Sequence, residues 1–221
     1  MKSAQSVFHG VVAGVVVVLM LLTGPAVSAT SGQQEFRFRV LLDDDEIGTH
    51  HFRVRREAGE EIVEIDAEFK VKFIGITVYS YVHANRELWR DGCLQRIESS
   101  TDDNGDAFKV DGRDEGERFQ LSTQDGEREL AAGCVMSFAY WNPAFLKQDR
   151  LINTQDGEYL DVEVSPPVLE QREVRGEMQP SWRYSLEAGP LKLDLWYSTN
   201  DEWLALESEA QGGRTLRYEL L

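Results

Sequence analysis

The feature that most limits how this chain can fold is the regular alternation of its side chains from Gln34 onward. The clearest run has one apolar and one charged face, formed by Val63, Ile65, Ala67, Phe69, Val71 and Phe73 and by Glu64, Asp66, Glu68, Lys70 and Lys72. Successive side chains of a β-strand point to opposite faces. We therefore expect a sheet with one face buried and the other in water.

Turn residues interrupt the alternating runs every eight to fifteen residues or so, with Ala58-Gly59, Asn104-Gly105 and Asp125-Gly126 among them. Asn-Gly is a strong signal for a two-residue hairpin. Together these signals predict an all-β fold, a single-domain antiparallel meander over residues 30–221 that forms a strongly curved sheet or an open β-barrel.

The segment Cys134–Gln148 breaks this pattern, because it is rich in aromatic residues and contains no acidic residue. Asn142 can cap a helix, and Pro143 can occupy the first helical position. We expect one short helix or an irregular covering segment near residues 134–150.

Residues 1–29 are typical of a secretory signal peptide, with Lys2, an apolar run from Val11 to Leu22, and small residues that suit cleavage after Ala29. The apolar run is shorter than the roughly 20 residues that span a bilayer. Neither cysteine lies near the cleavage point, so a lipid-modified cysteine there is excluded. We expect an exported protein with no stable membrane anchor after cleavage.

The chain is strongly acidic, with 39 acidic residues, 23 basic residues and a net charge of −16. Loss of residues 1–29 removes one base, Lys2, and no acid, which leaves −17. Such a charge repels phosphate backbones, so no nucleic-acid partner is expected. The charge also disfavours anionic membrane surfaces, and its simplest role is solubility.

Two cysteines, Cys93 and Cys134, are the whole thiol content of the chain. In an oxidising compartment such a pair is more often a disulfide than a site. Two ligands do not complete a zinc site. We therefore expect a Cys93–Cys134 disulfide.

The strand expected over Thr77–Trp89 has two unlike faces. One face carries the larger and more polar side chains, which are Thr77, Tyr79, Tyr81, His83, Asn85, Glu87 and Trp89. The opposite face, with Val78, Val82 and Leu88, resembles an ordinary core contact. The mixed face and the aromatic segment supply the candidate ligand-binding residues Tyr79, Tyr81, His83, Asn85, Glu87, Trp89, Phe138, Tyr140 and Trp141.

These aromatic residues have two interpretations. They can form a second core in which the irregular segment plugs an open end of the sheet. Alternatively, the curved sheet leaves a cavity for an apolar or amphipathic ligand, with His83, Asn85 and Glu87 as its few polar groups.

Catalytic and metal sites have weaker support. The Cα atoms of His83 and Glu87 would lie roughly 13 Å apart in one strand, too far to share a metal ion. Asp102, Asn104 and Asp106 imitate a calcium loop, but Ala107 and Arg113 stand where glycine and glutamate are needed. No catalytic frame surrounds Ser80 or Ser137. We expect no metal, no cofactor and no catalytic residue.

Several motifs together resemble a family of exported Gram-negative bacterial proteins known only as a domain of unknown function. They are G-T-H-H-F-R-V (48–54), Y-x-Y-x-H-x-x-x-E-x-W (79–89), S-x-T-x-x-N-G (99–105), F-A-Y-W-N-P (138–143), L-I-N-T-Q-D-G (151–157) and G-R-T-L-R-Y-E-L (213–220). The resemblance implies a periplasmic protein and transfers no activity. More loosely, the fold is similar to the open β-barrels of periplasmic lipoprotein carriers, an analogy that does not fix function.

We hypothesise a non-enzymatic periplasmic protein that binds a lipid-like or other apolar ligand, or that assists envelope-lipid metabolism. One alternative is an enzyme that uses His83 and Glu87 in a pocket. The other is a scaffold that binds an unidentified envelope protein through a sheet edge.

Overall fold

The structure is a computed structural model that describes residues 32–131 and 133–221. The expected signal peptide and its cleavage point after Ala29 lie outside the described residues. No helix in the described part of the chain is long and apolar enough to cross a membrane.

Almost every described element is a β-strand. The strands are β1 (Gly32–Leu42), β2 (Asp45–Glu57), β3 (Glu60–Phe73), β4 (Ile76–Arg90), β5 (Cys93–Asp103), β6 (Asp106–Asp114), β7 (Arg118–Thr123), β8 (Gly126–Ala131), β9 (Arg150–Ile152), β10 (Tyr159–Asp161), β11 (Glu163–Val164), β12 (Val168–Val174), β13 (Glu177–Ala188), β14 (Leu191–Ser198), β15 (Trp203–Ala210) and β16 (Arg214–Leu220). Two short 3-10 helices, η1 (Pro143–Lys147) and η2 (Gln211–Gly213), complete the set.

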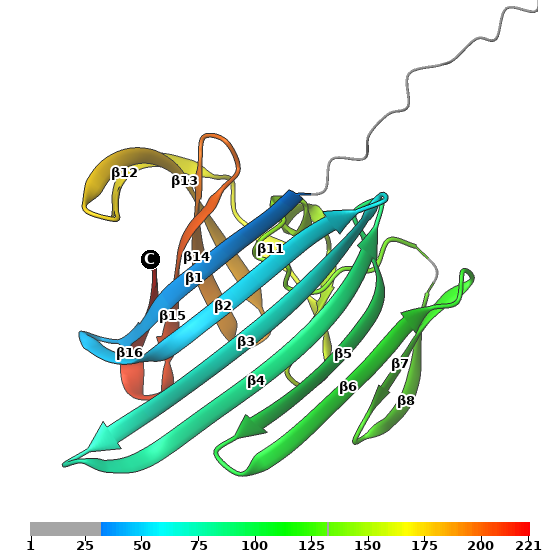
Figure 1. Cartoon of the computed structure of the whole chain (residues 1–221), viewed down its shortest axis with the longest axis horizontal. Coiled ribbons are helices and arrows are strands. Elements are labelled where there is room, and N and C mark those ends of the chain that lie inside the picture. Colours follow the sequence, from blue (N-terminus) through cyan, green and yellow to red (C-terminus); the bar gives the residue numbers. More distant parts are fainter. Residues whose placement is uncertain (1–31, 132) are drawn as a thin grey trace, which may run out of the picture.

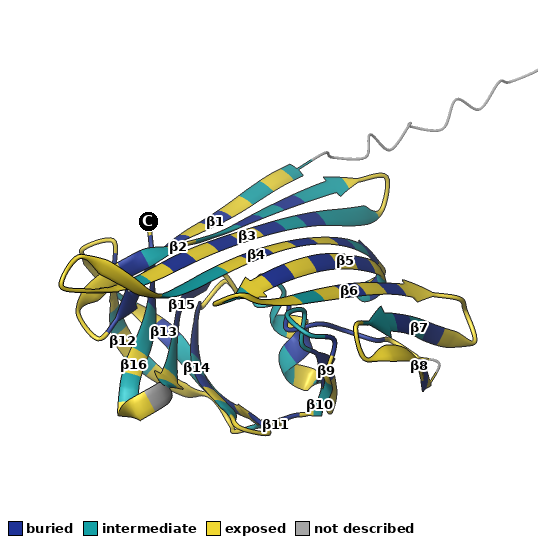
Figure 2. Ribbon diagram, turned by 90° about the horizontal axis from the view of Figure 1, so that it is seen from below, coloured by how far each residue is buried: buried dark blue, intermediate teal, exposed yellow. Residues whose placement is uncertain are grey.

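One 14-stranded antiparallel sheet contains all strands except β9 and β10, which pair with each other. Its order runs from β11 through β13, β14, β15 and β16 to β1, and then from β1 to β8, with β12 also on β13. The sheet curves strongly, and its pairings end at β11 and β8 without closing (Figures 1 and 2). The prediction of an all-β, strongly curved, open sheet is confirmed.

The alternation in β3 becomes the two faces of the sheet, as predicted. Val63, Ile65 and Ala67 are buried on the concave side, whereas Asp66 and Glu68 are exposed on the outer side. Figure 2 shows the same alternation as buried and exposed bands along the neighbouring strands. Phe73 departs from the pattern and is 67% exposed, because it lies at the β3–β4 turn, where no other described element covers it.

A segment from Cys134 to Ile152 lies inside the curve of the sheet (Figure 2). It contains η1, whose first turn is capped by Asn142 Oδ1, which accepts a 3.1 Å hydrogen bond from the Ala144 amide. Pro143 opens the helix, and Phe145 is buried on its inner side. The expected short helix within a covering segment is therefore confirmed.

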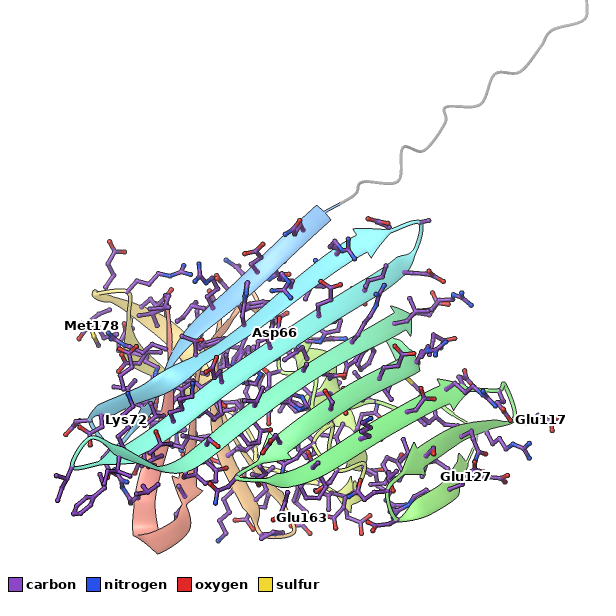
Figure 3. All side chains as sticks on the ribbon, turned by 60° about the horizontal axis from the view of Figure 1, so that its bottom comes forward. Asp66, Lys72, Glu117, Glu127, Glu163 and Met178 are labelled. Atoms are coloured by element: carbon purple, nitrogen blue, oxygen red, sulfur yellow. A yellow bond between two sulfur atoms is a disulfide. The ribbon has the colours of Figure 1, made fainter. Side chains whose placement is uncertain are left out.

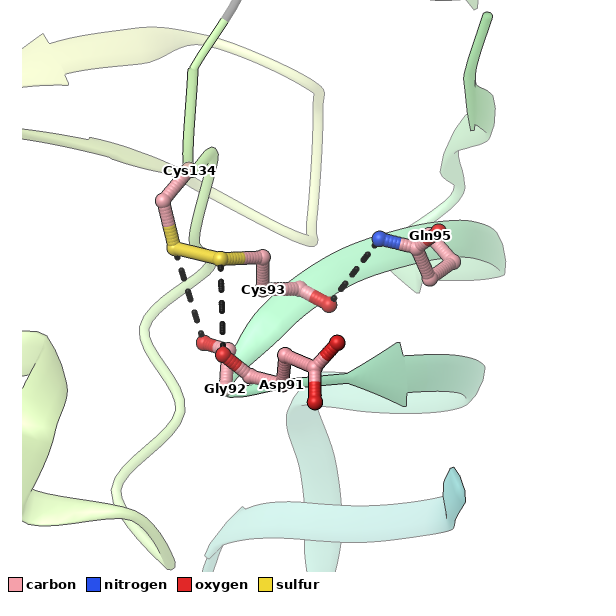
Figure 4. Close-up of a disulfide and its surroundings, with 5 residues drawn as sticks. All are labelled: Asp91, Gly92, Cys93, Gln95 and Cys134. Atoms are coloured by element: carbon pink, nitrogen blue, oxygen red, sulfur yellow. Dashed lines mark hydrogen bonds between the residues drawn. A yellow bond between two sulfur atoms is a disulfide. The ribbon is translucent and has the colours of Figure 1, made fainter. Parts of the chain in front are cut away.

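A disulfide between Cys93 and Cys134 ties this covering segment to the start of β5, as predicted (Figure 4). Its two sulfurs each lie 3.7 Å from a carbonyl oxygen of the β4–β5 turn, those of Asp91 and Gly92. Beside it, the Leu94 amide donates a 2.9 Å hydrogen bond to the Val135 carbonyl. The entrance of the covering segment is thereby fixed to the sheet.

Two expectations about strands are wrong. Val78 and Val82 do not face a core, since they are 54% and 49% exposed on the outer side of β4, and Leu88 on the same face is half-buried. The covering segment lies on the concave side, and no other described element covers this outer face. The alternation over Glu170–Met178 also predicts a single strand, but a turn at Arg175-Gly176 divides it, and both turn residues have positive φ.

Candidate functional site

The concave face of β4 is divided into a packed part and an open part. His83, Asn85, Glu87 and Trp89 are buried, whereas Tyr79 and Tyr81 remain partly accessible. The division reflects the covering segment and the loop after β9, which lie over the second half of the strand. The inward-facing residues of the Tyr79–Trp89 motif thus lie in two environments, one packed and one partly open to solvent.

Glu87 is the most deeply placed charged residue of the packed part, with 1% of its surface exposed. Its Oε1 accepts hydrogen bonds from Asn85 Nδ2 and Ser137 Oγ, both at 2.9 Å, and its Oε2 accepts one from Trp89 Nε1 at 2.8 Å. Burial raises the pKa of the Glu87 carboxyl, and the three hydrogen bonds oppose that rise. This carboxyl joins β4 to the covering segment.

His83 has a partner on each ring nitrogen. Nδ1 lies 2.9 Å from Thr101 Oγ1, and Nε2 lies 3.4 Å from Thr154 Oγ1. Because the Thr101 hydroxyl donates to the Gln155 carbonyl, it accepts from His83, which puts the ring proton on Nδ1. Burial lowers the pKa of His83 to about 4. His83 and Glu87 thus have separate hydrogen-bond partners.

The loop after β9 explains two of the sequence motifs, because they contact each other. Ser99 Oγ donates a 2.6 Å hydrogen bond to the Thr154 carbonyl. Two residues further along β5, the Thr101 hydroxyl donates to the Gln155 carbonyl. Gly157 packs so closely on β7 that a Cβ would lie 2.5 Å from Thr123 Cγ2. The S-x-T motif of β5 therefore holds the L-I-N-T-Q-D-G loop (151–157) against the sheet.

The aromatic residues of the covering segment are part of the core. Trp141 is buried with its ring edge-on to Trp89, 5.5 Å between centroids, and Tyr140 packs 5.2 Å from Trp203. Phe138 is buried as well. Trp141 Nε1 and Asn85 Oδ1 are buried without a described hydrogen-bond partner. The structure therefore places Phe138, Tyr140 and Trp141 with the packed part.

A cavity of about 550 Å³ adjoins the open part of β4. It lies at the end of the sheet where the β1–β2, β3–β4 and β15–β16 turns gather (Figure 1). Apolar and aromatic side chains form most of its wall, and the polar groups are few. The lining residues are Leu42, Ile47, Phe69, Val71, Tyr79, Tyr81, Asp103, Gln155, Ala210, Arg214, Leu216 and Tyr218.

Of the residues proposed from sequence, Tyr79 and Tyr81 line this cavity, and the other seven do not. Sequence reasoning missed Phe69, Leu216 and Tyr218. The rings of Phe69 and Tyr81 stack with 5.3 Å between their centroids. Tyr218, which lies on β16, packs edge-on against the ring of Phe69 on β3. Alternation marked Phe69 as an inward residue, but no local signal distinguishes a cavity wall from a filled core.

Polar groups occupy two places on the cavity wall. Gln155 accepts a hydrogen bond from the Tyr81 hydroxyl at 3.3 Å and donates one to Asp103 Oδ2 at 3.3 Å. Arg214 pairs with Asp43 at 2.7 Å near the other side. Burial raises the pKa of both Tyr79 and Tyr81, and the Asp103 carboxylate adds to each rise. Both phenols are therefore neutral hydrogen-bonding groups.

The neighbouring histidines of β2 point to opposite faces of the sheet, because successive side chains of a strand alternate. His50 lies inside, with Nδ1 3.3 Å from the Tyr218 hydroxyl, and its burial lowers its pKa well below the usual value. His51 lies outside, where Nε2 is 3.4 Å from a Glu35 carboxylate oxygen. No group of three or more potential metal ligands occurs among the described residues.

The fold and the cavity define a class of open, β-barrel-like proteins with an apolar hollow at one end. Residues 38–221 match the family described as Domain of unknown function (DUF6134), and the chain belongs to that family. None of the curated proteins compared with this chain matches it.

A solved structure with a similar fold is a "Beta-barrel-like Protein of Domain of Unknown Function DUF1849 from Brucella abortus". It shares 12% sequence identity with this chain, and the similarity covers 89% of this chain and 98% of that one, with a TM-score of 0.60. At this identity the likeness concerns the fold alone.

Proposed function

We propose that this protein is a non-enzymatic binding protein that holds a lipid-like or other apolar molecule in the cavity beside Tyr79 and Tyr81. It is exported to the periplasm through a cleaved signal peptide and serves there as a carrier or accessory in envelope-lipid metabolism. The cavity is the single observation that carries this proposal, because it is a preformed hollow with a mostly apolar wall.

The size and chemistry of the cavity support this ligand class. Binding sites for small molecules are mostly apolar hollows of roughly 300–1,000 Å³ with a few fixed polar groups. Here Gln155, already oriented by Tyr81 and Asp103, and Arg214 at the rim supply those groups. An amphipathic molecule would place its chain against Phe69 and Leu216 and its polar end toward Gln155 or Arg214.

A larger hollow, of about 1,000 Å³, lies over the outer face of the sheet but fits this ligand class less well. Its wall includes the charged residues Arg53, Glu64 and Asp66, of which Arg53 is already paired with both carboxylates. Water solvates such groups on an open convex face. An apolar ligand would have to displace that water without replacing its hydrogen bonds.

The test is to fill the cavity. Ala210 lines it, so Ala210→Phe should occupy the space that a ligand needs. Binding of a fluorescent fatty-acid probe is measured by titration with the purified protein. We expect the wild type to bind the probe and the variant to bind at least about tenfold more weakly, since the lost apolar contacts approach those of one large side chain.

The matched control is Ala84→Phe, the same exchange at an exposed position on the outer face of β4. It should leave probe binding unchanged. Equal affinity of Ala210→Phe and the wild type, or no binding of the probe by the wild type together with no copurifying ligand in native mass spectrometry, would reject the proposal.

A further inference from the structure

The tip of the β3–β4 hairpin is apolar and exposed. Phe73, Ile74 and Ile76 are 67%, 83% and 69% exposed, and Phe73 and Ile76 are paired across the two strands on either side of the turn. Figure 1 shows this hairpin extending past the ends of the neighbouring strands. Exposed apolar groups gathered at one place are a sign of an interaction site.

The two-residue turn Ile74-Gly75 has an unusual residue at its first position. Ile74 has φ of 49°, in the left-handed region, where a β-branched residue is strained. The other described non-glycine residues with positive φ are not β-branched; they are Asp43, Ala58, Asp91, Asn104, Arg175 and Asp201. The equivalent two-residue turn between β5 and β6 uses Asn104-Gly105, the pair that such turns prefer. Stability alone does not explain an isoleucine at this position.

Charge also changes toward the tip. The outer row of β3 reads Glu64, Asp66 and Glu68 and then Lys70 and Lys72. Figure 3 shows Asp66 in the middle of the outer face and Lys72 near the tip. No acidic residue lies between Glu68 and Glu87 in this acidic chain. Lysine can hold its charge in water while its stem lies along an apolar surface.

The tip is continuous with the cavity. On the concave side of β3, Phe69 and Val71 line the cavity, and Phe73 is the next residue of the same row. Val71 is paired with Tyr79, another lining residue. An apolar path therefore runs along one hairpin from the cavity wall to the exposed tip.

We propose that the β3–β4 hairpin tip inserts into the surface of a lipid bilayer and holds the mouth of the cavity against the membrane. A narrow protruding turn suits a deformable lipid surface. It offers far less than the roughly 800 Å² per partner that a stable protein interface buries. This docking goes beyond ligand binding and is measured without a cavity ligand.

The test is flotation with phosphatidylcholine vesicles, using the purified protein without residues 1–29 so that the apolar run Val11–Leu22 cannot bind lipid. The described strand pairings lie within residues 32–221, so this form keeps the fold. We expect the wild type to float with the vesicles. The double variant Phe73→Ser, Ile76→Ser should partition at least about tenfold less, because two large apolar contacts are lost.

Leu169→Ser is the matched control, because Leu169 is an exposed apolar residue, 54% accessible, on β12. It should float as the wild type does. A wild type that stays with the soluble fraction, or a double variant that floats equally well, would overturn membrane docking. So would a wild-type dimer in sedimentation velocity that the double variant abolishes while neither form binds vesicles.

Probe binding in solution keeps this proposal separate from the proposed function. A double variant that binds the fatty-acid probe normally but does not float retains the cavity and lacks only the docking tip. A wild type that floats but binds no probe would support docking and reject the ligand site.

Discussion

Ser137 Oγ donates a 2.9 Å hydrogen bond to Glu87 Oε1, and through this bond the covering segment is attached to the middle of the sheet. Ser137 is also bridged to Ile152, so one residue contacts the sheet and the end of the covering segment together. The two residues that this bond joins are 50 positions apart in the sequence, and both are buried.

Glu87→Ala should lower the free energy of unfolding by roughly 2–4 kcal/mol, because it removes the acceptor of three buried donors. Glu87→Gln should cost less, since one oxygen still accepts from Asn85 and Ser137 while the amide faces the Trp89 donor. Denaturant titrations at neutral pH compare the two. Equal stability of Glu87→Ala and the wild type would contradict the buried network.

Glu87 should also make stability depend on pH in a defined direction. Its folded pKa lies above the unfolded value of 4.5, so its contribution is fully present below pH 4.5 and is lost as pH rises through the folded pKa. The stability difference between wild type and Glu87→Gln should therefore shrink from pH 4.5 upward. Parallel curves for the two proteins would show that the folded pKa is not raised.

His83 should act in the opposite direction. Its pKa falls from 6.5 in the unfolded chain to about 4 in the fold, so its contribution is present above pH 6.5 and is lost as pH falls toward 4. The full loss amounts to about 3 kcal/mol. Nuclear magnetic resonance should find no titration of the His83 ring between pH 5.5 and 8, and a midpoint near 6.5 would contradict its burial.

Loss of the disulfide should loosen the covering segment. Cys93→Ser with Cys134→Ser opens a loop with a sequence separation of 41 residues, which should lower stability by up to about 4 kcal/mol. Hydrogen exchange at the Leu94 amide should quicken, since its partner Val135 follows Cys134 directly. In the wild type, alkylation without reductant should label neither Cys93 nor Cys134, because both are in the disulfide.

Ile74→Asn should stabilise the fold by roughly 1 kcal/mol, because asparagine adopts the left-handed conformation of this turn with less strain. The gain is measured by thermal or denaturant unfolding. A variant that is more stable than the wild type but binds vesicles less well would show that Ile74 costs folding stability and contributes to membrane binding. A variant that is less stable than the wild type would show that Ile74 is not strained in this turn.

The regular parts of the fold were predictable from sequence because their signals are local. Alternation over Val63–Phe69 defined a face, Asn104-Gly105 defined a hairpin, and Asn142-Pro143 defined a helix start. The turn at Arg175-Gly176 was missed, because arginine is an unusual residue at positive φ.

The site was predicted only in part, because its boundaries depend on distant segments. Both faces of Thr77–Trp89 are mixed, so the sequence could not show that Val78 and Val82 face water. The cavity brings Tyr81 beside Tyr218 across the β1–β16 pairing, and no local pattern encodes that pairing. The packed and open parts of β4 differ only in what a distant loop covers.

Strand β1 pairs with β2 along one edge and with β16 along the other, where Phe38 lies opposite Leu220. During synthesis β1 emerges well before β16, because the other described strands lie between them in the sequence. One edge of β1 therefore stays unpaired until β16 has been made. Contacts of such long sequence separation form slowly. The pairing of β1 with β16, which joins the two halves of the sheet, is thus a late event in folding.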